Sequence, residues 1–313
     1  EEYMFFKQYN FHKQKISFHR ATMKFYEEYL IKNGLDVKYI NSFETESEIS
    51  LLIEKIKLLG FKSIEIYDPV DYLLSKRIIK KCREVDINLI IHDSLLFINS
   101  RDDLKDFFKD SKKKFFQTSF YKNERKIKNI LIEKNGKPTG GDWTYDILNR
   151  KRFPKDTSPP KIKNPKKNKY IEESYEYVIK YYNDNYGILG HFNYPSTIDE
   201  SEEWLKDFLD NRFHNFGDYE DSIVRDELTL NHSILSPLMN VGFITPDKVI
   251  SRSIAFSKKK NIPINSTEGF VRQILGWREF IRGVYISKGS YERSLNFWKF
   301  KRKIPVSFYT GNT

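Results

Sequence analysis

Helical and strand-like periods alternate along the first third of the chain, and this alternation limits the fold more than any other feature of the sequence. Residues 15–34 and 46–60 carry apolar side chains at helical spacing, and each pattern ends at a glycine. Short β-rich runs lie at 36–40, 62–68 and 87–93. Strands separated by helices pair in parallel, because the helix carries the chain back across the sheet. We therefore predict an α/β, doubly wound parallel-sheet domain over residues 1–132, with its first strand upstream of the residues given.

Two aspartates follow predicted strands at the edge where doubly wound sheets bind ligands. Asp68 ends the run at 62–68 and Asp93 ends the run at 87–93. No glycine-rich phosphate loop follows either strand, so each carboxylate is a candidate ligand residue or a cap of its own loop. Between the two strands a helix is predicted from Pro69 onward, because proline suits the first turn of a helix.

The pattern changes after residue 132. Turn-forming pairs such as Asn-Gly, Lys-Pro and Gly-Gly follow one another at 135–141 and predict a loop that packs tightly against another part of the molecule. Beyond residue 172 strand signals are scarce and the apolar spacing is helical. We therefore expect an interdomain linker at 133–171 and a mostly α-helical domain at 172–313.

The net charge of +11 indicates a polyanionic partner, but the charge is spread unevenly. Residues 151–170 hold eight Lys and Arg against one Asp, in a proline-rich stretch that cannot form a regular element. This stretch is either a solvated linker or a contact for a phosphate backbone. No apolar stretch is long enough to span a bilayer and no signal peptide is visible, so we expect no membrane partner.

Cysteine usage limits both compartment and metal chemistry. Cys82 is the only cysteine, which excludes a disulfide within the chain and any metal site that needs two thiolates from it. The cytoplasm is the default compartment for such a composition. The six histidines also lack the spacing of zinc ligands.

Three segments in the second half carry side chains suited to chemistry. The first, "FGDYEDSIVRDE", gathers carboxylates that could bind Mg²⁺, hold an arginine or start a helix, at Asp218, Glu220, Asp221, Asp226 and Glu227. The second, "NHSILSPLMNVGFITP", places His232, Ser233 and Ser236 ahead of Pro237. Hydroxyls and backbone amides near a helix start can hold a pyrophosphate, and serines there can equally cap the helix.

The third segment is "EGFVRQILGWREF", residues 268–280. On a helix, Gln273, Trp277 and Arg278 lie at i, i+4 and i+5 and share one broad face, which suits a flavin or an ordinary surface helix. Arg278 and Glu279 are adjacent and point apart, so they cannot pair with each other. The apolar residues of the segment, Phe270, Ile274 and Phe280, are expected to pack into the hydrophobic core and anchor the helix.

Together these segments resemble the photolyase/cryptochrome superfamily, through "HSILSP", "GFITP" and "EGFVRQILGWREF". More narrowly, "FHKQK", "GKPTGGDWTYDILNRK" and "FGDYEDSI" are similar to the iron–sulfur bacterial cryptochrome/photolyase class, the deoxyribodipyrimidine photolyase-related proteins. The resemblance runs from Glu1 to Thr313.

This resemblance implies an antenna domain followed by a helical domain that holds FAD in a folded conformation. It also implies light-driven electron transfer to a pyrimidine dimer or (6-4) lesion in UV-damaged DNA, by a monomer. Carried over residue by residue, the FAD-binding positions are Tyr219, His232, Ser233, Leu235, Ser236, Gln273, Trp277 and Arg278. We assign no catalytic residue and no metal ligand.

The resemblance also implies a lumazine-type antenna chromophore and a 4Fe-4S cluster in the full-length family. The four cluster cysteines are absent from this chain, so we expect a truncated FAD-binding domain. The main hypothesis is a (6-4)-type DNA photolyase or a fragment of one. The alternatives are a non-catalytic blue-light receptor of cryptochrome type, and a cofactor-free remnant that binds nucleic acid through residues 151–170.

Overall fold

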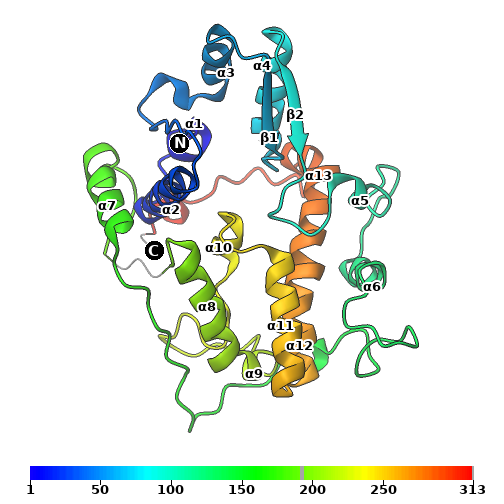
Figure 1. The fold of residues 1–313 in the computed structure, drawn as a ribbon. Helices are drawn as coiled ribbons and strands as arrows, with labels where there is room; N and C mark the ends of the chain where they lie inside the picture. Colours follow the sequence, from blue (N-terminus) through cyan, green and yellow to red (C-terminus); the bar gives the residue numbers. More distant parts are fainter. Residues whose placement is uncertain (191–193, 312–313) are drawn as a thin grey trace.

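A computed structural model of the protein describes residues 1–190 and 194–311 (Figure 1). The chain forms a mixed α/β fold in which helices predominate, and the sheet formed by the described residues has two parallel strands. The helices before the predicted linker are α1 (Tyr3–Phe6), α2 (Lys13–Lys32), α3 (Ile49–Leu58), α4 (Tyr72–Glu84), α5 (Arg101–Lys105) and α6 (Gln117–Ile127). The later helices are α7 (Lys169–Tyr181), α8 (Ile198–Asn211), α9 (Phe213–Phe216), α10 (Ser236–Asn240), α11 (Pro246–Lys260), α12 (Ile264–Val271), α13 (Glu279–Ser294) and α14 (Ser307–Thr310).

The sheet consists of β1 (Ser63–Tyr67) and β2 (Asn88–His92), joined by α4. The strands pair in parallel register, from Ser63 opposite Asn88 to Tyr67 opposite His92. Helices α3 and α4 lie beside the strands (Figure 1). A small apolar core joins them, with Ile53 from α3, Ile78 and Cys82 from α4, and Ile64 and Leu89 from the strands. The predicted strands at 62–68 and 87–93 and their parallel pairing are therefore confirmed.

Two local predictions in this part are wrong. Residues 36–40 form an extended segment and not a strand, because no described strand lies alongside, and the Ile40 carbonyl instead accepts from the amino group of Glu1 at 2.8 Å. Helix α4 begins at Tyr72 rather than at Pro69. Val70 has φ +64°, which interrupts the helical backbone, and the Asp71 carboxylate then caps the helix by accepting from the Leu74 amide at 2.8 Å.

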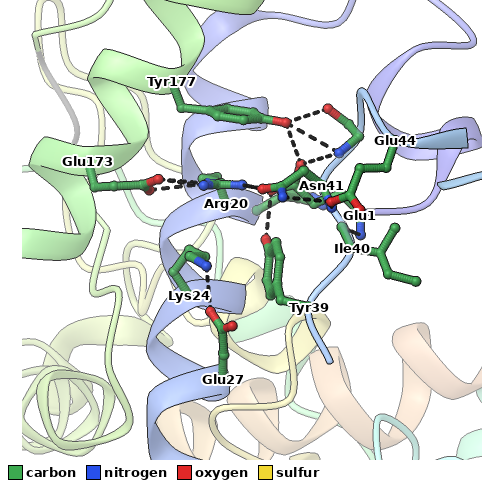
Figure 2. Close-up of polar contacts among 12 residues, drawn as sticks. Glu1, Arg20, Lys24, Glu27, Tyr39, Ile40, Asn41, Glu44, Glu173 and Tyr177 are labelled. Atoms are coloured by element: carbon green, nitrogen blue, oxygen red, sulfur yellow. Dashed lines mark hydrogen bonds and ion pairs between the residues drawn. The ribbon is translucent and has the colours of Figure 1, made fainter. Parts of the chain in front are cut away.

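A buried polar cluster joins α2, α7 and the extended segment after α2 (Figure 2). The Glu1 carboxylate accepts from Arg20 Nη1 at 2.8 Å, from the Tyr39 hydroxyl at 2.6 Å and from the Tyr177 hydroxyl at 2.7 Å. On its other side Arg20 binds both carboxylate oxygens of Glu173 on α7. Helix α7 begins at Lys169, within the last residues of the predicted linker, yet it packs against α2 near the start of the chain.

The largest apolar core lies among α8, α9, α11 and α12. Phe208, Phe213, Phe216 and Phe270 meet there with ring centroids 4.8–6.1 Å apart. The helical spacing predicted beyond residue 172 is confirmed in each of the longer helices. In the part of the chain that the structure describes, no helix is long and apolar enough to cross a membrane.

Candidate functional site

The segment "EGFVRQILGWREF" lies in one continuous helix, Ile264–Ser294, which contains a π-helical stretch. Helix α12 leads into seven π-helical residues, Arg272–Arg278, and α13 continues from Glu279. A π-helix closes its hydrogen bonds over five residues instead of four; it is rare and often lies at functional sites. Gln273, Trp277 and Arg278 all lie within or at the end of this stretch.

Close packing holds the π-helical stretch in place. Phe270, Ile274 and Phe280 are buried, as the sequence predicted. Gly276 lies so near α6 that a Cβ there would stand 2.6 Å from the amide nitrogen of Gln117 and 3.3 Å from the Tyr121 ring. A larger residue here would have to displace the Gln117 side chain, so glycine favours this close contact between the π-helical stretch and α6.

On its other side the stretch borders an open pocket of about 450 Å³. The pocket is lined by Gln273, Trp277 and Arg278, together with Val70, Phe97, Ile281, Arg282 and Tyr285. The structure thus brings three of the sequence-predicted site residues together. Val70 and Phe97 come from loops that follow β1 and β2, so the pocket lies where the carboxyl ends of the parallel strands meet the long helix.

Two arginines share one aromatic ring in this pocket. The guanidinium groups of Arg278 and Arg282 lie 4.7 Å and 4.4 Å from the centroid of the Phe97 ring. Arg278 donates to the Leu96 carbonyl at 3.2 Å, but its buried Nε has no hydrogen-bond partner. Burial lowers the pKa of both guanidinium groups, because the charged form loses hydration. Trp277 is 43% exposed and meets Phe280 edge-on at 6.2 Å.

Glu279 ties the long helix to the loop after β2. Its carboxylate accepts from the backbone amides of Ile98 at 2.9 Å and Asn99 at 3.1 Å, and from the Asn99 side-chain amide at 3.1 Å. Burial raises the pKa of this carboxyl group, and these hydrogen bonds partly oppose that rise. Adjacent Arg278 and Glu279 therefore point apart, as predicted, and each binds a different part of the same loop.

Asp68 follows the last residue of β1 and contacts two arginines, Arg101 and the Arg282 of the pocket. Its carboxylate binds Arg101 through two hydrogen bonds of 2.7 and 2.8 Å, and Arg282 lies 3.5 Å away. It also accepts from the Val70 amide at 3.0 Å. Although burial alone would raise it, the Arg101 hydrogen bonds hold the pKa of Asp68 below its usual range. Asp68 is therefore a loop cap and an arginine partner, whereas Asp93 is exposed.

The acidic segment at 216–227 holds an arginine, one of the roles considered from the sequence. Glu220 accepts from the Gln273 amide and from Asn149 at 3.0 Å, and lies 3.6 Å from Arg272. Arg272 also pairs with Glu268 at 3.3 Å. Among the described residues no group of acidic, histidine or cysteine side chains could hold a metal ion; His191 lies outside them.

The turn-rich segment before residue 150 packs on α12, as its turn chemistry predicted. The Tyr145 amide donates to the buried Glu268 carboxylate at 2.9 Å, and burial raises the pKa of that carboxyl group. Gly140 has φ +79°, and a Cβ there would stand 2.3 Å from the Tyr145 hydroxyl. Asp146 reaches Arg272 at 3.1 Å, so this segment joins the same ion-pair network.

The predicted pyrophosphate segment lies apart from the pocket. His232 and Ser236 are exposed, whereas the Leu235 side chain is buried in the main core. The Ser233 carbonyl accepts from the Trp204 indole at 2.9 Å, and Tyr219 packs against Phe153 with ring centroids 5.1 Å apart. None of these five predicted residues lines the pocket beside Trp277. The link between the two groups is Glu220, which follows Tyr219 and binds Gln273.

Sequence reasoning missed five residues of the pocket: Val70, Phe97, Ile281, Arg282 and Tyr285. Arg282 could have been predicted from the sequence, because it follows Arg278 by four positions and so shares its helix face. Phe97 and Val70 depend on contacts between distant segments. Tyr285 accepts a hydrogen bond from the Tyr72 amide at 2.9 Å, a contact across more than 200 residues.

Comparison with known proteins gives a family match and several similar proteins. The family model described as deoxyribodipyrimidine photo-lyase-related protein matches residues 1–194. A (6-4) photolyase from Agrobacterium fabrum is 29% identical over 306 residues, which cover 96% of this chain and 60% of that protein. The uncharacterized protein R852 from Acanthamoeba polyphaga mimivirus is 40% identical over 144 residues, 45% of this chain and 71% of that protein. The chain thus spans about 60% of the length of the photolyase that it matches.

Proposed function

Because the chain belongs to the deoxyribodipyrimidine photo-lyase-related protein family, we propose that it is a photolyase-type flavoprotein that uses light to repair pyrimidine lesions of the (6-4) type in DNA. The Agrobacterium relative supports the lesion class, since its name is (6-4) photolyase. The observation that carries the proposal is the π-helical stretch, which directs Gln273, Trp277 and Arg278 into one open pocket.

Three properties of the pocket support flavin binding. Its volume of about 450 Å³ lies within the usual range of ligand pockets, roughly 300–1,000 Å³. The partly exposed Trp277 ring offers an aromatic face, and the buried Arg278 Nε lacks the acceptor that a ligand atom would supply. When bound, FAD supplies the light-excited electron. In this proposal Gln273, Trp277 and Arg278 orient the ring and limit its exposure to water.

We propose that the phosphate groups of the same FAD are held by the segment beside Tyr219. His232 and Ser236 expose their side chains there, and Leu235 contributes only its backbone because its side chain lies in the core. The Ser233 carbonyl already binds Trp204, so Ser233 would donate through its hydroxyl or amide. The contact between Glu220 and Gln273 joins this segment to the pocket.

The wider organisation that we propose follows the family. Residues 1–132 would form the antenna-type domain for a lumazine-type chromophore, 133–171 the linker, and 172–313 would belong to the helical FAD-binding domain. UV-damaged DNA is the proposed partner of a monomeric chain. A 4Fe-4S cluster is not proposed for this chain, because Cys82 is its only cysteine and lies buried in α4.

The test is flavin binding followed by repair. The purified chain should keep flavin absorbance after desalting, and it should repair an oligonucleotide containing a (6-4) lesion in blue light but not in darkness. Arg278→Leu should lose flavin, whereas Arg252→Leu, which removes an exposed arginine on α11, should keep it. Flavin binding without repair would favour the blue-light receptor, and a protein that takes up no flavin would contradict the proposal.

A second candidate is supported by the exposure of the Lys-rich stretch. Lys155, Lys161 and Lys163 are exposed and lie in a segment without regular structure. A cofactor-free protein that binds nucleic acid there would lose affinity steeply with salt and would respond to neither lesion nor light. Replacing these three lysines with glutamine should then weaken binding to every sequence equally.

A further inference from the structure

The segment after α13 exposes three aromatic side chains in one turn. Phe297, Trp298 and Phe300 have exposed fractions of 71%, 71% and 75%. Large aromatic side chains are usually well buried, so a group of this kind marks an interaction surface. In Figure 1 this segment leaves the end of α13 and runs across the view toward the C-terminus.

Local hydrogen bonds hold the turn without a hydrophobic core. The Lys299 amide donates to the Asn296 carbonyl at 3.0 Å, and the Asn296 side chain donates to the Phe300 carbonyl at 2.7 Å. Lys299 has φ +54°, a left-handed conformation that reverses the chain between its aromatic neighbours. We call residues 296–303 the aromatic turn.

The ring geometry of the aromatic turn suits stacking. The Trp298 and Phe300 rings are nearly parallel, with 19° between their planes and 6.4 Å between their centroids. Phe297 meets Trp298 edge-on at 4.9 Å and supports it from the side. Two exposed rings in one orientation can each receive a flat ligand group.

Positive charge surrounds these rings. Lys299, Lys301, Arg302 and Lys303 are exposed, and none makes an ion pair with a residue in the described ranges. Other surface cations, such as Lys248 and Arg252 beside Glu202, are paired. An apolar peptide would cover the rings but leave these charges without partners. A polyanion with flat, exposed groups satisfies both features.

We propose that the aromatic turn binds single-stranded nucleic acid. Unpaired bases stack on Trp298 and Phe300, and Lys301, Arg302 and Lys303 contact the phosphates, in the manner of sequence-tolerant single-strand binding surfaces. A duplex hides the faces of its bases, so it offers the rings nothing to stack on. This surface is separate from the pocket beside Trp277 and from residues 151–170, and it requires neither flavin nor light.

The test measures, by fluorescence anisotropy, how the full chain binds a labelled twelve-nucleotide oligothymidylate. It is done in darkness and without added flavin. The double substitution Trp298→Ala and Phe300→Ala should weaken binding by about 5- to 150-fold for each base released. Phe308→Ala is the matched control, because Phe308 is 79% exposed on the same tail but lies outside the aromatic turn. This variant should bind the oligonucleotide as tightly as the parent protein. Replacing Lys301, Arg302 and Lys303 with Gln should reduce the slope of log K against log salt by about 2.

Three results would overturn the proposal. The double variant could bind as tightly as the parent, a duplex of equal length could bind as tightly as the single strand, or the turn could mediate a dimer that disappears in the double variant. Circular dichroism of each variant checks that it is folded, which is expected because the side chains are exposed. Failure of flavin binding or of repair would leave this dark measurement unaffected, so the two proposals fail separately.

Discussion

Removing the Glu279 carboxylate should release the loop after β2 from the long helix. The substitution Glu279→Ala leaves three donors without their acceptor, the amides of Ile98 and Asn99 and the Asn99 side chain. Each buried donor left unpaired costs about 1–3 kcal/mol. Burying the Glu279 carboxylate also costs free energy, as its raised pKa indicates, so the three hydrogen bonds contribute less net stability than their sum. We therefore expect a loss of about 3 kcal/mol of unfolding free energy, a large share of the roughly 5–15 kcal/mol typical of a domain.

Urea unfolding at pH 7, followed by circular dichroism, measures this loss. Glu279→Gln keeps one acceptor oxygen and the side-chain volume, so it should lose about half as much. Glu292→Ala removes an exposed glutamate from the same helix and should change stability by less than about 0.5 kcal/mol. Hydrogen exchange at Ile98 and Asn99 should accelerate only in the Glu279 variants. If Glu279→Ala unfolds at the same urea concentration as Glu292→Ala, the role assigned to this carboxylate is wrong.

Three further predictions concern buried groups and one turn. Burial raises the pKa of Glu124, whose Oε2 has no hydrogen-bond partner, so ionisation of this carboxyl group destabilises the fold as pH rises above about 4.5. Glu124→Gln should therefore raise the urea midpoint at pH 8 and leave it unchanged at pH 4. Burial lowers the pKa of His19 to about 4, so the fold should lose stability as pH falls from about 6.5 toward 4, and His19→Gln should flatten that loss of melting temperature. Gly140→Ala should lower the melting temperature more than Gly141→Ala, because both have positive φ but only the Cβ at 140 would meet Tyr145; equal losses would argue against that contact.

Much of the local structure could be predicted because it depends on near neighbours in the sequence. Apolar spacing indicated the two strands and the long helices, and the adjacent positions of Arg278 and Glu279 indicated that they point apart. The turn-rich segment near Gly140 was expected to pack closely, and it does so against α12. Each of these inferences rests on a period or a backbone preference that a few residues can express.

The remainder depends on distant contacts. The β-rich residues 36–40 needed a neighbouring strand, and the amino group of Glu1 binds their backbone instead. The pocket beside Trp277 combines Phe97 with residues nearly 200 positions away, and no local pattern predicts that contact. The π-helical stretch could not be predicted either, because the spacing of side chains over seven residues does not distinguish a π-helix from an α-helix.

That stretch has a consequence for reading related sequences. A π-helical hydrogen bond spans one residue more than an α-helical one, so this stretch holds an extra residue within an otherwise α-helical run. A relative with a one-residue gap within 272–278 would close the stretch into an ordinary α-helix and keep Arg282 and Tyr285 on their present face. The same gap within α13 would instead turn everything after it by about 100°.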